Sequence, residues 1–203
     1  MKTVNVCATV NPDLCEGCKT CEMVCPVYAV KVKKKAKEIK VDIDTERCVG
    51  CWNCEQRCPV RAITMVTCEP RVLGTDVSTV DYPDIQALCA KACLHPDQLV
   101  CYCTATRAEE MAAAILTGAS TPDAVVLATG AGSGCGIECN QSIQRFLTAA
   151  GLNYERPKPG WQWYGKTVTA WEINPKVIAG HPVFRFEDDR KLLERIAGAK
   201  TPK

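Results

Sequence analysis

An internal repeat in the first third of the chain places the strongest constraint on its fold. Residues 15–27 (CEGCKTCEMVCPV) align with residues 48–60 (CVGCWNCEQRCPV), so that four cysteines, a glycine, a glutamate, a proline and a valine coincide. Such self-similarity at one fixed offset indicates two equivalent structural units. Because units this small bury little apolar surface, they need extra stabilisation such as bound metal.

The composition points the same way. Sixteen of the 203 residues are cysteines, whereas aromatic residues make up only 6%. The sequence opens without a secretory leader and contains no apolar run long enough to span a membrane. We therefore expect a soluble cytoplasmic protein, in which thiols stay reduced and serve metal ligation or redox chemistry. The net charge of +2 argues against a nucleic-acid partner.

Each copy of the repeat has the spacing C-x2-C-x2-C-x3-C-P, which is typical of [4Fe–4S] clusters. Three closely spaced thiolates hold one cluster, and the fourth cysteine of each run binds the cluster of the other copy. The predicted ligands are Cys15, Cys18, Cys21 and Cys58 for the first cluster, and Cys48, Cys51, Cys54 and Cys25 for the second. Zinc is the alternative, but zinc ribbons use two C-x2-C pairs separated by a longer loop.

On these motifs, residues 1–68 resemble a bacterial-type two-cluster ferredoxin. Apolar residues alternate with polar ones on both sides of Lys33–Lys35, which predicts a β-hairpin over residues 30–43. Segments around Val4 and Ile63 supply a possible second strand pair. The three lysines are either a docking patch for an acidic partner or a solvated hairpin tip that discourages edge pairing.

A second cysteine module lies further along the chain. Cys101 and Cys103 form a C-x-C pair, and Cys135 and Cys139 follow in a glycine-rich stretch. Three helices are predicted around them. A capping box at Thr106–Glu109 opens a helix that runs to about residue 117, and Thr121–Pro122 opens a second helix that ends at Gly130. A third helix follows Cys135, carries Ile143, Phe146 and Leu147 on one face, and ends at Gly151.

Residues 100–150 resemble the [2Fe–2S] domain of bacterioferritin-associated ferredoxins. The resemblance implies one [2Fe–2S] cluster whose ligands are Cys101, Cys103, Cys135 and Cys139. The last pair has three intervening residues here, whereas the family usually has two. Zinc and a thiol pair active in metal transfer are the alternatives. The glycine-rich stretch lacks the G-x-G-x-x-G register of a dinucleotide-binding loop.

Four cysteines remain outside these motifs: Cys7, Cys68, Cys89 and Cys93. Cys89 and Cys93 are four residues apart in a segment of helical composition, so both are expected on one helix face. Buried structural thiols are the favoured interpretation, and a further cluster is the other. We interpret residues 69–99 as a linker.

The segment 151–203 contains seven of the twelve aromatic residues, broken by prolines into extended pieces. Only residues 185–197 have a helical pattern. We interpret this segment as an arm that packs against another subunit, because exposed aromatic residues and arginines are common interface anchors. The alternative is that it folds back over the two cluster domains.

Together these features predict an α+β chain with a ferredoxin-like two-cluster domain, a small helical [2Fe–2S] domain and an extended C-terminal arm. No catalytic residues and no organic cofactor site are expected, because the sequence shows no P-loop, H-E-x-x-H, nucleophile elbow or paired carboxylates. The expected role is an iron–sulfur electron-transfer subunit, in a hetero-oligomer with a larger flavoprotein or metalloenzyme oxidoreductase. A metallochaperone for copper or iron–sulfur units and a freely diffusing ferredoxin are the alternatives.

Overall fold

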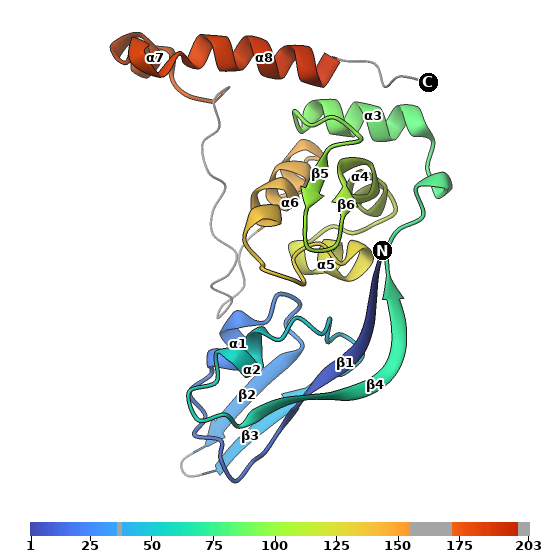
Figure 1. The fold of residues 1–203 in the computed structure, drawn as a ribbon, viewed down its shortest axis with the longest axis vertical. Coiled ribbons are helices and arrows are strands. Elements are labelled where there is room, and N and C mark those ends of the chain that lie inside the picture. The colour runs from blue at the N-terminus through green and yellow to red at the C-terminus, as the bar shows by residue number, and fades with distance from the viewer. Residues whose placement is uncertain (36–37, 155–171, 199–203) are drawn as a thin grey trace.

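The computed structural model describes residues 1–35, 38–154 and 172–198 (Figure 1). Its fold class is α+β, as predicted. Among the described residues, no helix has the length and apolar character needed to cross a membrane.

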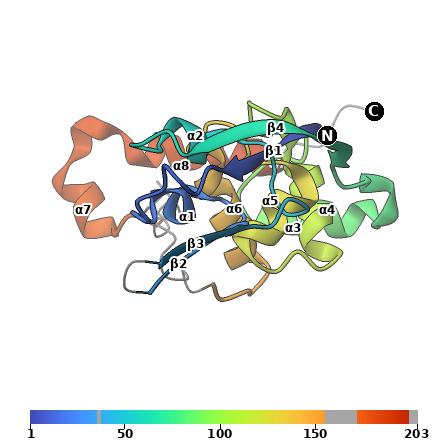
Figure 2. The ribbon, with the colours of Figure 1, turned by 90° about the horizontal axis from the view of Figure 1, so that it is seen from below.

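The N-terminal unit (residues 1–73) is built from two separate antiparallel strand pairs and two short helices (Figure 2). The strands are β1 (Lys2–Val10), β2 (Val30–Lys35), β3 (Glu38–Ile43) and β4 (Ile63–Leu73), and the helices are α1 (Thr20–Val24) and α2 (Asn53–Gln56). Val30 pairs with Ile43 in the hairpin β2–β3, and Val10 pairs with Ile63 in the pair β1–β4. Both strand pairs predicted from the alternating pattern are therefore confirmed.

The sequence repeat is also a repeat of backbone conformation. Lys19 and Trp52 both have φ of 65° at the start of a short helix, and Tyr28 and Arg61 both have φ of 53° after the fourth cysteine. A positive φ is uncommon for residues with a Cβ. Its occurrence at the same two places in each run shows that the two cysteine runs have the same local backbone conformation.

The helical unit (residues 82–149) contains the second cysteine module. Its elements are α3 (Tyr82–Lys91), β5 (Leu99–Cys101), β6 (Thr106–Arg107), α4 (Ala108–Leu116), α5 (Pro122–Thr129) and α6 (Glu138–Ala149). The second helix starts and ends as predicted, because the Thr121 side chain accepts a hydrogen bond from the Ala124 N–H and Gly130 takes a left-handed conformation. The third helix buries Ile143, Phe146 and Leu147 as expected.

Two local predictions for this unit are wrong. Thr106 does not cap α4, because it lies in β6 and its hydroxyl bonds to Thr104 and to the Thr129 carbonyl instead. Cys93 does not share a helix face with Cys89, because α3 ends at Lys91 and Cys93 has a positive φ of 55°. At Thr106 a tertiary contact overrides the short-range pattern, and at Cys93 the helix ends two residues earlier than the composition indicated.

The segment interpreted as a linker contains regular structure. β4 continues to Leu73, the 3-10 helix η1 (Val77–Thr79) follows, and α3 then packs against α4 and α6. Ile85, Leu88 and Cys89 of α3 are buried. Residues 82–91 are thus packed into the helical unit.

The described part of the C-terminal segment is helical. It contains α7 (Pro175–Gly180), the 3-10 helix η2 (Pro182–Phe184) and α8 (Phe186–Gly198), and α8 corresponds to the one predicted helix. α8 lies beside α3 (Figure 1). None of the described side chains of α8 is buried, and Phe184 of η2 and Leu192 of α8 are exposed. The aromatic residues Trp161, Trp163, Tyr164 and Trp171 lie outside the described residues.

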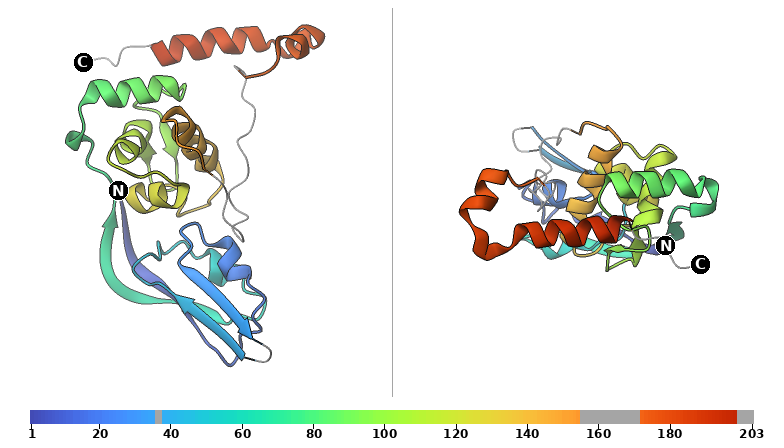
Figure 3. Two further views of the ribbon diagram at one scale, coloured as in Figure 1. Left: turned by 180° about the vertical axis from the view of Figure 1, so that it is seen from behind. Right: turned by 90° about the horizontal axis from the view of Figure 1, so that it is seen from above.

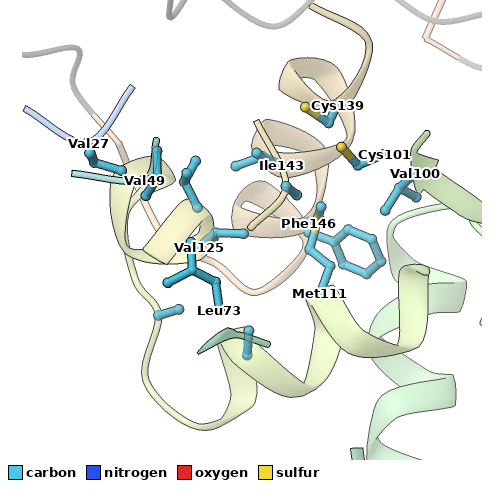
Figure 4. Close-up of a cluster of buried hydrophobic side chains, with 14 of the residues drawn as sticks. Val27, Val49, Leu73, Val100, Cys101, Met111, Val125, Cys139, Ile143 and Phe146 are labelled. Carbon is cyan, nitrogen blue, oxygen red and sulfur yellow. The ribbon is translucent and has the colours of Figure 1, made fainter. Parts of the chain in front are cut away.

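A single core runs through both units. Figure 3 shows the ribbon β1–β4 curving from the N-terminal unit to α5, where the N-terminus lies. The buried apolar side chains form one continuous cluster. Val49 of the N-terminal unit approaches α5, which carries Val125, while Met111, Ile143 and Phe146 fill the helical unit (Figure 4). The two units therefore pack directly on each other.

Candidate metal centres

The first cysteine set (Cys15, Cys18, Cys21 and Cys58) lies at the more exposed side of the N-terminal unit. Cys18 is exposed and Cys15 and Cys58 are partly buried, whereas Cys21 is buried at the base of α1. Burial raises the pKa of Cys21 to about 11, and the nearby Cys18 and Cys15 add to this effect. A hydrogen bond with the Thr20 hydroxyl, 3.4 Å away, lowers the pKa of Cys18. Cys15, Cys18 and Cys21 are thus close enough for their charges to influence one another.

The second cysteine set (Cys25, Cys48, Cys51 and Cys54) is more deeply buried. Burial raises the pKa of Cys51 to about 11 and that of Cys54 to about 12, and the charge of Cys25 contributes to both shifts. Cys25 belongs to the first run of the sequence but lies beside the cysteines of the second. This is the crossed arrangement expected from the spacing, although the ligand assignment itself remains a prediction.

The fourth cysteine of each run is held by the backbone in the same way. The Ala29 N–H donates to Cys25 Sγ, and the Ala62 N–H donates to Cys58 Sγ, both at 3.2 Å. Such N–H donors favour thiolate over thiol, and a cluster needs thiolate ligands. The residues therefore fit an anionic iron–sulfur group.

The third cysteine set (Cys101, Cys103, Cys135 and Cys139) comes from two distant parts of the helical unit. Cys101 ends β5 and Cys139 lies in the first turn of α6, and their sulfurs face each other in the core (Figure 4). A hydrogen bond with Cys139 lowers the pKa of Cys101 to about 4, and the same bond together with burial raises the pKa of Cys139. The structure thus brings Cys139 into the set despite its unusual spacing.

Cys103 and Cys135 form the exposed half of the third set. The Cys135 N–H donates to Cys103 Sγ at 3.4 Å. Backbone N–H groups of Ile137 and Glu138, at the start of α6, lower the pKa of Cys135. A helix N-terminus with converging N–H groups suits negatively charged sulfur.

The glycine-rich loop before α6 allows the chain to approach these thiols closely. A Cβ on Gly134 would lie 2.4 Å from Cys103 Cβ and 2.8 Å from its Sγ, so no side chain fits there. Gly136 has a φ of 67°, which glycine adopts without strain. The loop conformation therefore depends on glycine at both positions, as the functional interpretation of this stretch requires.

The second and third sets meet where the two units touch. The Lys2 ammonium donates to the Val49 carbonyl, to the Ser133 carbonyl and to the Ser133 hydroxyl, each at 2.9 Å. Burial lowers the pKa of Lys2, while the nearby charges of Cys51, Cys48, Cys101 and Cys103 act in the opposite direction. A Cβ on Gly136 would lie 3.9 Å from Asn53 Nδ2, so the loop of the third set touches the helix that carries Cys54.

Sequence reasoning missed Lys2 and Asn53. The only signal for Lys2 was its position two residues before Val4 in an alternating strand, which places a lysine on the same face as a buried valine. Asn53 carried no signal, because its neighbour Gly136 is 83 positions away in the sequence.

The four remaining cysteines lie outside the three sets, although Cys7 is close enough to Cys48 for that charge to raise its pKa. Cys7 and Cys68 face each other across β1 and β4, and burial together with their hydrogen bond raises the pKa of Cys7. Cys89 is buried in α3, where burial raises its pKa to about 12. None of the sixteen cysteines, all within the described residues, forms a disulfide. In the described part of the chain, no three His, Cys, Asp or Glu side chains form a group suited to a single metal ion.

Comparison with known protein families gives two matches. Residues 14–62 match the model of a 4Fe-4S dicluster domain, and residues 99–149 match that of a BFD-like [2Fe-2S] binding domain. No curated protein matches the chain. The two matched segments contain all three cysteine sets, in the order in which the structure places them. The chain therefore joins a 4Fe-4S dicluster domain to a BFD-like [2Fe-2S] binding domain.

Proposed function

We propose that this chain is an iron–sulfur electron-transfer subunit that works with a larger oxidoreductase, either a flavoprotein or a metalloenzyme. It holds two [4Fe–4S] clusters and one [2Fe–2S] cluster on the three cysteine sets. When bound, such clusters accept and release single electrons at potentials set by their surroundings. We place the protein in the cytoplasm, where thiol ligands stay reduced.

The contact between the second and third cysteine sets carries this proposal. The carbonyl of Val49, next to Cys48, and the carbonyl of Ser133, two residues before Cys135, bind the same ammonium group. The first and second sets are adjacent, because Cys25, the fourth cysteine of the first run, lies beside Cys51 and Cys54 of the second. The three sets thus follow one another without an intervening layer of chain, which is the arrangement that a relay requires.

The three cysteine sets form a row from the first set through the second to the third, and both ends of this row are open to partners. At one end Cys18 is exposed, and Leu14, the chain neighbour of Cys15, is 50% exposed. At the other end Cys103 and Cys135 are exposed, and their neighbours Tyr102 and Ile137 are 73% and 69% exposed. Exposed large apolar side chains next to a metal site favour protein contact. One end suits the acceptance of electrons and the other their release.

Contacts between the units hold the row in one geometry. Arg47 donates to the Val27 carbonyl and forms an ion pair with Asp123 at 2.8 Å, at the start of α5. The hydroxyl groups of Tyr28 and Tyr154 are 3.0 Å apart. These contacts favour a constant separation between the second and third sets.

A metallochaperone role for the third set is the second candidate. The exposure of Cys103 and Cys135 favours it, because transfer of copper or an iron–sulfur unit requires accessible thiols. The complete burial of Cys139 favours a resident cluster instead.

The decisive experiment starts with the full chain purified without oxygen from its native source. We expect about ten irons per chain, EPR signals of two four-iron centres and one two-iron centre, and co-elution with a subunit that contains flavin, molybdenum, tungsten or nickel. After partial reduction, rapid-freeze EPR should show electrons equilibrating between four-iron and two-iron centres. A chain that elutes alone would overturn the subunit role. About eight irons, no two-iron signal and copper bound by Cys101 and Cys103 would favour the metallochaperone.

A further inference from the structure

The charge of Lys2 lies close to two cysteine sets at once. Its pKa is influenced by Cys48 and Cys51 of the second set and by Cys101 and Cys103 of the third. Other basic residues near the unit boundary act differently, since Arg47 pairs with Asp123 and with the Val27 carbonyl.

The ammonium group is held in a single orientation. A lysine ammonium has three N–H donors, and Lys2 places 2.9 Å contacts on three acceptors: the carbonyls of Val49 and Ser133 and the Ser133 hydroxyl. The acceptors come from both units, and residues 2 and 133 are far apart in sequence. The Lys2 stem passes Gly130, where an added Cβ would lie 3.1 Å from Lys2 Cβ. The charge is therefore fixed and partly shielded from solvent.

We propose that Lys2 is a positioning residue whose positive charge favours the reduced state of the second [4Fe–4S] cluster and of the [2Fe–2S] cluster together. This inference rests on the proposed cluster assignment. Reduction adds one negative charge to a cluster, and a nearby fixed cation stabilises that charge. Screening is weaker for a half-buried cation than for an exposed one. Lys2 thus raises both reduction potentials and leaves that of the first cluster unchanged.

A role as a mere tether between the units is the competing explanation. In that case, any substitution that weakens the contact between the units should change the reduction potentials in the same way as a substitution of Lys2. Asp123→Asn distinguishes the two explanations, because it breaks the ion pair between Arg47 and Asp123 across the boundary and leaves the charge and contacts of Lys2 in place.

The test is an EPR-monitored redox titration of the full chain with its clusters, comparing four variants. Lys2→Gln removes the charge but keeps a hydrogen-bond donor, and Lys2→Arg keeps the charge. Asp123→Asn controls for the boundary, and Lys31→Gln controls for net charge at an exposed position in β2. We expect Lys2→Gln to lower the midpoint potentials of the two-iron centre and of one four-iron centre by ~59 mV. For one electron this is about a tenfold change in the ratio of reduced to oxidised centres. The other four-iron centre and the remaining three variants should keep wild-type midpoints.

Wild-type midpoints in a fully loaded Lys2→Gln protein would overturn the proposal. Equal shifts in Lys2→Gln and Asp123→Asn would assign Lys2 a tether role only. If Lys2→Gln loses iron, Lys2→Met replaces it, and loss of iron in Lys2→Met and Lys2→Arg alike would again mean a tether. These midpoints require no partner subunit. A chain that elutes alone but shows the shifts would overturn the proposed subunit role and leave the role of Lys2 intact.

Discussion

The two units bring their ligands together by different means. In the N-terminal unit, three thiols of each set lie within seven residues of one another, on a loop whose backbone conformation repeats at the two sites. In the helical unit, the pairs Cys101–Cys103 and Cys135–Cys139 are separated by α4 and α5, and only the packing of these helices brings them together. In the first unit, close spacing along the chain brings three thiols of each set together, whereas in the second the packing of helices brings two distant pairs together.

The largest expected effect comes from removing a ligand in the N-terminal unit. Cys21→Ala should lower the iron content by about four iron atoms per chain. It should also lower the temperature at which this unit unfolds, because cluster binding is part of its folding free energy. Iron analysis and anaerobic calorimetry measure both effects. Cys89→Ala, a buried cysteine outside the sets, is the control for iron content. Unchanged iron and an unchanged transition in Cys21→Ala would show that the ligand assignment is wrong.

Next in size is a core substitution that touches no ligand. Phe146 of α6 is fully buried on the side of α6 that faces α4. Phe146→Ala should therefore lower the free energy of unfolding by about 3–5 kcal/mol and abolish the two-iron EPR signal. Both four-iron signals should survive, because their ligands lie on local loops. Phe184→Ala, at an exposed position, is the matched control. Loss of all three signals together would mean that the units do not fold independently.

Removal of a ligand in the helical unit should affect the cluster more than the fold. We expect Cys139→Ala to lose the two-iron signal and to keep its helical circular dichroism, since Ile143 and Phe146 still fill the core. A two-iron signal retained in Cys139→Ala but lost in Cys139→Ala combined with Cys89→Ala would instead make Cys89 the fourth ligand.

A loop substitution tests the same unit more mildly. Gly134→Ala places a methyl group against Cys103 and should reduce occupancy of the two-iron centre, measured as EPR spin per chain. Gly180→Ala is the matched control, because Gly180, like Gly134, has no positive φ and nothing lies within 4 Å of its added Cβ. Equal occupancy in the two variants would contradict the close approach that we describe.

The smallest effect concerns the boundary between the units. Asp123→Asn breaks a partly exposed ion pair with Arg47 and should lower the free energy of unfolding by only about 0.5–1 kcal/mol. Anaerobic urea denaturation followed by circular dichroism measures this difference, with Lys31→Gln as the control. A loss of several kcal/mol would mean that the helical unit depends on the boundary as much as on its own core.

Much of each unit was predictable from the sequence because the rules involved are short-range. The repeat predicted equivalent loops, the alternating residues predicted both strand pairs, and Thr121, Pro122 and Gly130 predicted the limits of α5. The same kind of rule failed at Thr106. Its hydroxyl is hydrogen-bonded to the Thr104 hydroxyl and to the Thr129 carbonyl, and the capping-box pattern includes neither group.

The sequence by itself determined the spacing of the cysteines within each run and the local conformation around them, since spacing and backbone preference act over a few residues. Only the tertiary structure decided that Cys139 faces Cys101, that α3 belongs to the helical unit, and that Lys2 lies between two cysteine sets. The bonds of Lys2 to Val49 and Ser133 span 47 and 131 positions. Contacts over such separations arise from the packing of whole units, which no local pattern contains.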